Sequence, residues 1–322
     1  MDSRQDKIEE LKNISNIFYF KDNTIDKNSV LSIFSFLKDY SFQNQDYNSS
    51  IFHFLQYYCY KPKIPFLYKT DNSVFFSCFS SKKFNELIVS IPFFISRKKA
   101  ILELIEFLKK IDTNNILIRD IDDDFLNILN YELGKKFKIK SLKEIYYANY
   151  DIDKTLKLIG NNFSNLRWHL NSFNKAEHKI EFLDLKDNIK EVIHLIGKWR
   201  SKTIKERGFS FIDVRSYKMA ANYFGKHDFE DVFSSVLKID GVVSAFNLGY
   251  KIGPDIFAHS VGICDISIPH LAEFSQYEFW QKIRNHGFKY VNDGPTWRKS
   301  LGEFKNKFKP ISKKRYYWLN IL

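Results

Sequence analysis

The chain has 322 residues, of which 44% are hydrophobic, and a formal net charge of +12. Its length and hydrophobic share suffice for one large or two medium domains, and only 12 Gly and 7 Pro exclude collagen-like and low-complexity classes. The positive charge indicates attraction to polyanions such as nucleic acid, nucleotide phosphates or anionic lipid head groups, and a well-solvated Lys-rich surface explains it equally well.

The three cysteines are scattered along the chain without CxxC spacing, at Cys59, Cys78 and Cys264. No Cys/His cluster has metal-ligand spacing either, so we expect a reduced cytoplasmic protein without a metal site. The charged N-terminus lacks the apolar core of a signal peptide. The longest apolar run, residues 87–95, is shorter than the roughly 18 residues that span a bilayer, so we expect no membrane anchor.

The first half of the chain begins with a helical leader and then changes to strand periodicity. Helical spacing of apolar residues predicts leader helices at 28–40 and 49–58. Further along, the patterns predict strands at 64–70, 73–80 and 86–94, a helix at 97–111, a strand at 115–121, a helix at 122–133, and one or two strands at 136–150.

The second half starts with helices and ends with alternating strands and helices. The patterns predict helices at 153–176, 188–208 and 216–226, with a strand at 178–185 between the first two. They then predict strands at 231–239, 242–252 and 255–263, a helix at 269–287 that ends at Gly287, a strand at 288–293, a helix at 296–308, and a terminal strand at 313–322.

Residues 64–150 and 231–322 follow the same order of elements. Each has three strands, a long helix, a short strand, a shorter helix and a closing strand. An internal repeat is therefore the best organising hypothesis, in which each copy is a twisted, mostly antiparallel sheet with helices on its faces.

Three features together resemble a known group of proteins. They are the helix NFSNLRWHLNSFNK at 162–175, the strand and helix YVNDGPTWRKSLGEFKNKFKP at 290–310, and the repeated order of elements. The combination resembles the FemAB peptidoglycan aminoacyltransferases and the C-terminal domain of phosphatidylglycerol lysyltransferases (the DUF2156 domain). The resemblance covers most of the chain from about residue 60 onward.

The linker helix of that group carries an Arg-Asn, Asn and Phe-Lys series. Here Arg167, Asn171, Phe173 and Lys175 keep the spacing, while Trp168 stands where Asn is usual.

The group's final motif has Asn after a strand and then Lys-x-x-Phe-x-Pro. Asn292, Lys305, Phe308 and Pro310 match it, although the insertion between the two parts is shortened and altered.

The resemblance implies an α/β (α+β) fold made of two GNAT-like (acyl-CoA N-acyltransferase) lobes, with two mixed, mostly antiparallel sheets flanked by helices. An N-terminal lobe would span 1–150, including the helical leader 1–60, and a C-terminal lobe would span 151–322, with linker helices at 153–225. Relatives transfer an aminoacyl group from charged tRNA to an amine or a lipid hydroxyl, and GNAT enzymes proper use acetyl-CoA.

Acyl transfer needs groups that stabilise the developing oxyanion and a route for the nucleophile's proton. Lys305, beside Phe304, resembles the Phe-Lys pair of the final helix in the FemAB group and is the first candidate for an oxyanion or phosphate contact. A solvated lysine on a basic helix is the alternative. Asn292 and Asp293 follow a strand, where a sheet presents functional groups, and a turn role suits them equally well.

Arg167, Asn171 and Lys175 share one face of a helix, and together with Arg200 they could form an anion-binding strip. A polar, solvent-exposed helix face is the alternative. We count all four among the candidate substrate-binding residues.

His259, in a predicted central strand, is a candidate general base because imidazole titrates near neutrality, and a hydrogen-bonded core histidine is the alternative. Tyr277, Trp280, Phe304 and Phe308 are candidates for lining an acyl pocket. Core packing is the alternative for these aromatic residues.

The stretch GICDISIPHLAEF lacks the glycine-rich loop that cradles the pyrophosphate of CoA in GNAT enzymes. This favours charged tRNA as the donor, with no cofactor, over acetyl-CoA. We expect a cytoplasmic acyltransferase that moves an aminoacyl group from tRNA to an amine or hydroxyl of a phospholipid or peptidoglycan precursor, with peripheral membrane contact left open. The alternatives are an acyl-CoA-dependent N-acetyltransferase and a non-catalytic basic module that binds nucleic acid or an anionic surface.

Overall fold

The structure is a computed structural model that describes residues 3–19, 50–80, 85–111, 113, 115–133, 139–207, 213–296 and 298–321. The helix predicted at 28–40, and with it most of the leader, lies outside the described residues. The chain divides into two compact units, which are Met1–Tyr146 with Arg315–Leu322, and Tyr147–Lys314. The chain leaves the first unit along one strand and re-enters it along another.

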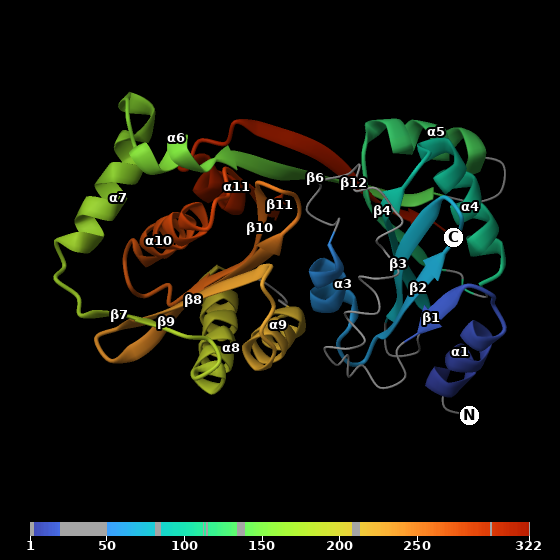
Figure 1. The fold of residues 1–322 in the computed structure, drawn as a ribbon, viewed down its shortest axis with the longest axis horizontal. Coiled ribbons are helices and arrows are strands. Elements are labelled where there is room, and N and C mark those ends of the chain that lie inside the picture. Colours follow the sequence, from blue (N-terminus) through green and yellow to red (C-terminus); the bar gives the residue numbers. More distant parts are fainter. Residues whose placement is uncertain are drawn as a thin grey trace. The chain divides into compact units, whose positions relative to one another are not determined.

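The first unit is an α/β sandwich around one mostly antiparallel sheet (Figure 1). Its elements are α1 (Ser3–Lys12), β1 (Ile17–Tyr19), α3 (Ile51–Tyr58), β2 (Ile64–Lys69), β3 (Ser73–Ser80), β4 (Glu86–Phe94), α4 (Arg97–Lys109), β5 (Ile116–Ile121), α5 (Asp123–Leu133), and the outer part of β12 (Ser312–Ile321). The strand order is β1-β2-β3-β4-β5-β12, with β4 and β5 parallel and the other pairs antiparallel.

Both faces of this sheet are covered, which explains why β2, β3 and β4 are buried along almost their whole length instead of alternating between buried and exposed residues. Successive side chains of a strand point to opposite faces. Phe75 accordingly stacks on Phe107 of α4, at 5.9 Å between ring centroids, while Phe76 contacts Phe54 of α3 at 4.9 Å. The aromatic residues of β2 and β3 therefore pack against helices on both faces of the sheet.

The second unit begins with the inner part of β6 (Ile139–Asp151) and contains the remaining elements. They are α6 (Ile152–Lys157), the 3-10 turn η1 (Asn161–Phe163), α7 (Ser164–Asn174), β7 (Ile180–Leu183), α8 (Ile189–Arg207), α9 (Arg215–Lys226), β8 (Val232–Ile239), β9 (Val242–Lys251), β10 (Ile256–Cys264), α10 (Leu271–Asn285), β11 (Tyr290–Thr296), and α11 (Lys299–Asn306).

The second unit also has helices on both faces of its sheet. The strand order is β6-β11-β10-β9-β8-β7, with β10 and β11 parallel and the pairs from β7 to β10 antiparallel. Helix α10 packs on one face, and α8 contacts the other alongside α9 (Figure 1). Phe279 and Trp280 of α10 are fully buried in the core with Phe257 of β10.

The repeated order of elements predicted from the sequence is confirmed, as is the α/β class with mostly antiparallel sheets flanked by helices. Strands β2 to β4, α4, β5, α5 and β6 follow the same order as β8 to β10, α10, β11, α11 and β12. Each closing strand joins the strands of the other copy. Strand β12, which ends the second copy, pairs with β5, and β6, which ends the first copy, lies beside β11. Among the described residues, no helix combines the length and apolar character that crossing a bilayer requires.

Two sequence expectations about element boundaries were wrong. The single helix predicted at 153–176 is interrupted, because Leu158 and Gly160 adopt positive φ angles of 52° and 92° and end α6 before α7 begins. The strand predicted to end at Asp293 instead continues to Thr296, so that Asn292 and Asp293 lie within β11. Gly294, at φ 61°, allows the strand to continue through a sequence that resembles a turn.

Gly249 of β9 lies opposite His259 of β10, and there is no room at this position for a side chain. An added Cβ would lie 2.1 Å from the carbonyl oxygen of Ala258, a backbone atom that cannot move without breaking the strand pairing. We predict that Gly249→Ala lowers the free energy of unfolding by about 3 kcal/mol in urea denaturation. Gly197→Ala in α8 is the control, since its Cβ would have no neighbour closer than 3.9 Å, and should add about 0.5 kcal/mol. Equal effects of the two changes would contradict this packing.

Candidate active site

A cluster of buried polar groups lies where β10 and β11 stop pairing. The parallel register between these strands ends at Ala258 and Asn292. The next residues, His259 and Asp293, are therefore the first beyond the shared hydrogen bonds. A β-bulge in the pairing of β10 with β9 falls between His259 and Val261. Irregular strand geometry of this kind re-aims side chains and often accompanies functional sites.

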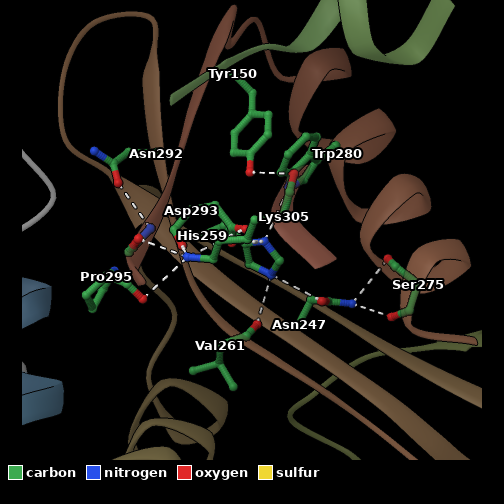
Figure 2. A network of polar contacts seen from close by, with 11 residues as sticks. Tyr150, Asn247, His259, Val261, Ser275, Trp280, Asn292, Asp293, Pro295 and Lys305 are labelled. Atoms are coloured by element: carbon green, nitrogen blue, oxygen red, sulfur yellow. Dashed lines mark hydrogen bonds and ion pairs between the residues drawn. The ribbon is translucent and has the colours of Figure 1, made fainter. Parts of the chain in front are cut away.

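The ring of His259 is buried and has polar neighbours at both nitrogens (Figure 2). On one side, Nε2 lies 3.0 Å from the carbonyl oxygen of Val261 and 3.2 Å from Oδ1 of Asn247. On the other side, Nδ1 lies 3.3 Å from Nε1 of Trp280 and 3.2 Å from Oδ1 of Asp293.

These contacts fix the tautomer of His259. A carbonyl oxygen can only accept, so Nε2 carries a proton and donates it to Val261. Since the indole of Trp280 can only donate, Nδ1 of the neutral ring accepts from it. When Nδ1 gains a proton it can donate to Asp293 instead. The one basic atom of His259 thus faces the carboxylate.

Asp293 has two oxygens in different surroundings. Oδ1 faces His259, whereas Oδ2 is buried, has no hydrogen-bond partner among the described residues and lies 3.9 Å from Nζ of Lys305. A buried carboxylate oxygen without a donor is costly, so such atoms call for an explanation such as a catalytic role or a missing ligand. Oδ2 is therefore positioned to accept a proton or hydrogen bond from a bound molecule.

Lys305 is 5% exposed and directs its ammonium group into the end of β11 rather than into solvent. Nζ donates to the carbonyl oxygens of Asp293, Gly294 and Pro295, the second at 2.9 Å and the third at 3.5 Å (Figure 2). Burial lowers the pKa of Lys305, and the charge of Asp293 partly opposes this shift. An ammonium group has three N–H donors, and the three carbonyl oxygens accept from them. Lys305 therefore acts on the rest of the site through its positive charge and not through a further hydrogen bond.

Further side chains hold this network in place. The hydroxyl of Tyr150 donates to the carbonyl oxygen of Lys305 at 3.0 Å, and burial raises the pKa of this phenol. Nδ2 of Asn247 donates to Oγ of Ser275 at 2.6 Å, which turns its Oδ1 toward His259. Asn292 accepts from the backbone N–H of Gly294 at 3.1 Å and supports the conformation of β11.

Of the predicted site residues, Lys305, Asn292, Asp293, His259 and Trp280 come together in this cluster. Trp280 is also part of the core, where its ring lies 4.8 Å from that of Tyr150.

The remaining aromatic candidates pack near this cluster or against a neighbouring helix. Phe308 is buried 5.1 Å from the ring of Trp280, and the half-buried Phe304 lies 5.6 Å from Phe308. The hydroxyl of Tyr277 donates to the carbonyl oxygen of Leu156 at 3.0 Å. These contacts are packing and capping contacts, and the acyl-pocket role stays a prediction.

The four residues of the predicted anion-binding strip lie in different environments. Arg167 donates to the carbonyl oxygens of Leu158 and Gly160, the latter at 2.8 Å, and so satisfies the end of α6. Asn171 and Lys175 are exposed on α7, and Arg200 is half-buried on α8. Their role as anion contacts stays a prediction.

The first unit also has a pair of parallel strands, and its pairing ends in a similar way to that of β10 and β11. There β4 and β5 pair as far as Val89 and Ile118. The carboxylate that follows, Asp120, has a positive φ of 60° and accepts a hydrogen bond from Nε1 of Trp318 at 2.9 Å. Because the comparable position of the second unit brings together His259, Asp293 and Lys305, we place the candidate active site there.

The loop after β10 contains a second charged cluster, which the sequence analysis missed. Asp265 accepts from Nζ of Lys198 at 2.5 Å and from Nζ of Lys202 at 3.0 Å, and also from the backbone N–H and hydroxyl of Ser267. Burial raises the pKa of Asp265, but the hydrogen bonds from Lys198, Ser267 and Lys202 outweigh it and hold the pKa well below its ordinary value. A carboxylate of the protein therefore accepts a hydrogen bond from the backbone N–H of Ser267 in the loop after β10.

A family model described as phosphatidylglycerol lysyltransferase, C-terminal, matches residues 53–319 of the chain. The chain belongs to this family. The resemblance that the motifs at 162–175 and 290–310 indicated is thereby confirmed. Among curated proteins, a sequence search finds no match.

Solved structures share the fold at low sequence identity. A conserved protein of unknown function from Bacteroides thetaiotaomicron is 19% identical, with a TM-score of 0.71 over 95% of this chain and 99% of that one. L-PGS from Bacillus licheniformis is 14% identical, with a TM-score of 0.59 over 92% and 91%. FemX is 14% identical, with a TM-score of 0.54 over 80% and 87%. These likenesses show the GNAT-like fold, and the family membership supports transferase activity.

Sequence reasoning missed three members of the candidate site: Tyr150, Asn247 and Ser275. Asn247 interrupts the otherwise apolar strand VVSAFNLGYK, and a polar residue at a buried strand position is a usable signal. Tyr150 and Ser275 carry no such signal, because their roles depend on contacts with residues far away in the sequence, Lys305 and Asn247.

Removing the ammonium group of Lys305 should destabilise the protein as well as the site. In Lys305→Met three carbonyl oxygens of β11 lose their donor and Asp293 loses its nearest cation. We expect a loss of about 3 kcal/mol in urea unfolding, as for one-sided removal of a buried ion pair. Lys299→Ala, an exposed lysine of the same helix, should change stability by less than about 0.5 kcal/mol. Equal stability of the two variants would show that Lys305 is not held as described.

Asp265 should make folding sensitive to acid. Its pKa is lower in the folded state than its ordinary 3.8, so the unfolded state binds more protons as the pH falls. Its stabilising contribution is complete above about pH 5 and is lost progressively as the pH falls through 3.8 toward the lower pKa of the folded state. Asp265→Asn should therefore lose less stability than the wild type as the pH is lowered below about 4 in urea titrations. Asp187→Asn, which changes an exposed carboxylate, should keep the wild-type pH profile, and an unchanged profile for Asp265→Asn would refute the assignment.

Proposed function

We propose that this chain is an aminoacyltransferase that moves an aminoacyl group from charged tRNA to the amine or hydroxyl of an acceptor of the phospholipid or peptidoglycan-precursor class. The observation that carries the proposal is Asp293. One of its oxygens lies 3.2 Å from Nδ1 of His259, and the other is buried without a donor among the described residues, beside the ammonium of Lys305. Acyl transfer needs a group that accepts the proton of the nucleophile and a positive charge that stabilises the oxyanion. Asp293 and Lys305 supply these two functions side by side.

In the proposed reaction the acceptor attacks the ester carbonyl of the aminoacyl group directly. A new C–N or C–O bond forms while the ester C–O bond to the ribose breaks. Oδ2 of Asp293 takes the proton of the nucleophile, and that proton then passes to the departing ribose oxygen. The charge of Lys305 stabilises the oxyanion of the tetrahedral intermediate through space, since its protons are held by β11 carbonyls. No covalent enzyme intermediate and no cofactor are required.

The donor is proposed to be charged tRNA rather than acetyl-CoA on two grounds. Asp265 already accepts from the backbone N–H of Ser267 and pairs with both Lys198 and Lys202, and this engagement of the donors opposes pyrophosphate binding after β10. The net charge of +12 suits a polyanion, whose binding weakens steeply as salt is added. Such a reaction would take place in the cytoplasm, where charged tRNA is found, with the acceptor reached at the membrane surface if it is a phospholipid.

The decisive experiment is a transfer assay with purified protein. Total tRNA charged with radiolabelled amino acids is incubated either with vesicles that contain phosphatidylglycerol or with peptidoglycan precursor, and label in the acceptor is measured. We expect transfer by the wild type and a loss of at least about 100-fold in Asp293→Asn, because removal of a general base typically costs this much. Lys299→Ala should transfer at the wild-type rate.

Other outcomes of the same measurements would favour the alternatives. Transfer from acetyl-CoA, together with a rise in melting temperature on adding it, would support an N-acetyltransferase. Salt-sensitive tRNA binding without transfer to any acceptor, unchanged in Asp293→Asn, would support a non-catalytic basic module.

A further inference from the structure

The second unit brings together two histidines and a glutamate that take no part in the candidate active site. His169 of α7 and His270, which precedes α10, approach to 2.8 Å between their Nδ1 atoms. Nδ1 of His169 lies 3.7 Å from Oε1 of Glu273, and one ligand atom from each of the three residues lies within 4.8 Å of the others. We propose that His169, His270 and Glu273 form a binding site for Zn²⁺.

The donor set suits zinc. Zn²⁺ takes imidazole nitrogen and carboxylate oxygen at about 2.0–2.2 Å, and three protein ligands leave a fourth position for water or another ligand. In a tetrahedral site the ligand atoms lie about 3.4 Å apart at these bond lengths. The two imidazole nitrogens, 2.8 Å apart, would therefore separate by about 0.6 Å, and the carboxylate oxygen, 3.7 Å from Nδ1 of His169, would approach that atom by about 0.3 Å. Side-chain rotation alone supplies such movements.

The backbone just before α10 helps to position these groups. His270 adopts a left-handed φ of 64°, which is uncommon for a residue other than glycine and is costly unless the surroundings maintain it. This conformation directs His270 toward His169 and places Glu273 one helical turn away. Glu273 is buried, so its carboxylate is shielded from water and available as a strong ligand.

Trp168 forms one wall of the cluster. Its ring is 57% exposed, yet it lies 4.9 Å from the rings of both His169 and His270 in edge-on contacts. A metal bound to the two imidazoles would therefore change the fluorescence of this tryptophan.

Lys307 competes with the metal in the proposed site. Its Nζ lies 2.6 Å from Oε1 of Glu273, the same oxygen that faces His169. Without metal, this ammonium neutralises the buried carboxylate. When Zn²⁺ binds, Lys307 must shift or take the other oxygen, so removing its charge should tighten zinc binding. Adventitious binding at surface histidines would not show this dependence.

The test measures ZnCl₂ binding to the full chain by isothermal titration calorimetry. We expect one site per chain whose dissociation constant rises by at least about tenfold in His169→Gln and in His270→Asn, the size of change that perturbed zinc ligation produces. His178→Gln is the matched control, since His178 pairs with Asp240, and should bind as the wild type does. Lys307→Met should bind more tightly than the wild type.

A second readout does not depend on variants that change the ligands. Co²⁺ in place of Zn²⁺ should give the visible absorption of a tetrahedral site. Cu²⁺ should quench tryptophan fluorescence in the wild type, and this quenching should disappear in Trp168→Phe. Absence of zinc binding would overturn the proposal. Binding that survives in both histidine variants, or that is unaffected by Lys307→Met, would also overturn it. The proposal stands or falls independently of acyl transfer.

Discussion

Parallel pairing between β10 and β11 stops at Ala258 and Asn292, and the polar groups of the candidate active site depend on that stop. If the two strands continued side by side, their backbone groups would satisfy one another and the interior would hold only apolar side chains. Because they part, the carbonyl oxygens at the end of β11 need another donor. The ammonium of Lys305 supplies it, and its charge in turn requires a carboxylate nearby, which Asp293 provides.

The end of the parallel pairing also explains how these polar groups can be buried, because each of them finds partners among its neighbours there. His259 is fixed in one tautomer by Val261 and Trp280, and its Nδ1 lies 3.2 Å from one oxygen of Asp293. The other oxygen has no hydrogen-bond partner among the described residues. The strands beside the site pack closely, because an added Cβ at Gly249, which pairs with His259, would lie 2.1 Å from the carbonyl oxygen of Ala258. A site preorganised in this way does not need to rearrange when charge develops during a reaction.

The sequence predicted the order of elements well because that order depends on local periodicity. Lys305 and Asn292 were found through the resemblance of residues 290–310 to the family's final motif, and Asp293 through its place at the end of a predicted strand. What could not be predicted depends on contacts between distant segments. His169 and His270 are 101 residues apart, so no local spacing reveals their contact, and Asp265 and Lys198 are 67 apart. The Asn-Asp-Gly-Pro sequence favours a turn locally, but β11 continues through it because Gly294 takes a positive φ.

The most direct test of the active-site assignment is a crystal structure with an amide-linked mimic of the charged tRNA end, such as adenosine carrying an aminoacylamino group at its 3′ position. The account predicts that the acyl group lies beyond the Ala258–Asn292 pair, with Oδ2 of Asp293 in hydrogen-bond contact with the ligand and Lys305 still bound to the β11 carbonyls. A mimic bound elsewhere in the protein, with Asp293 Oδ2 still lacking a partner, would contradict it.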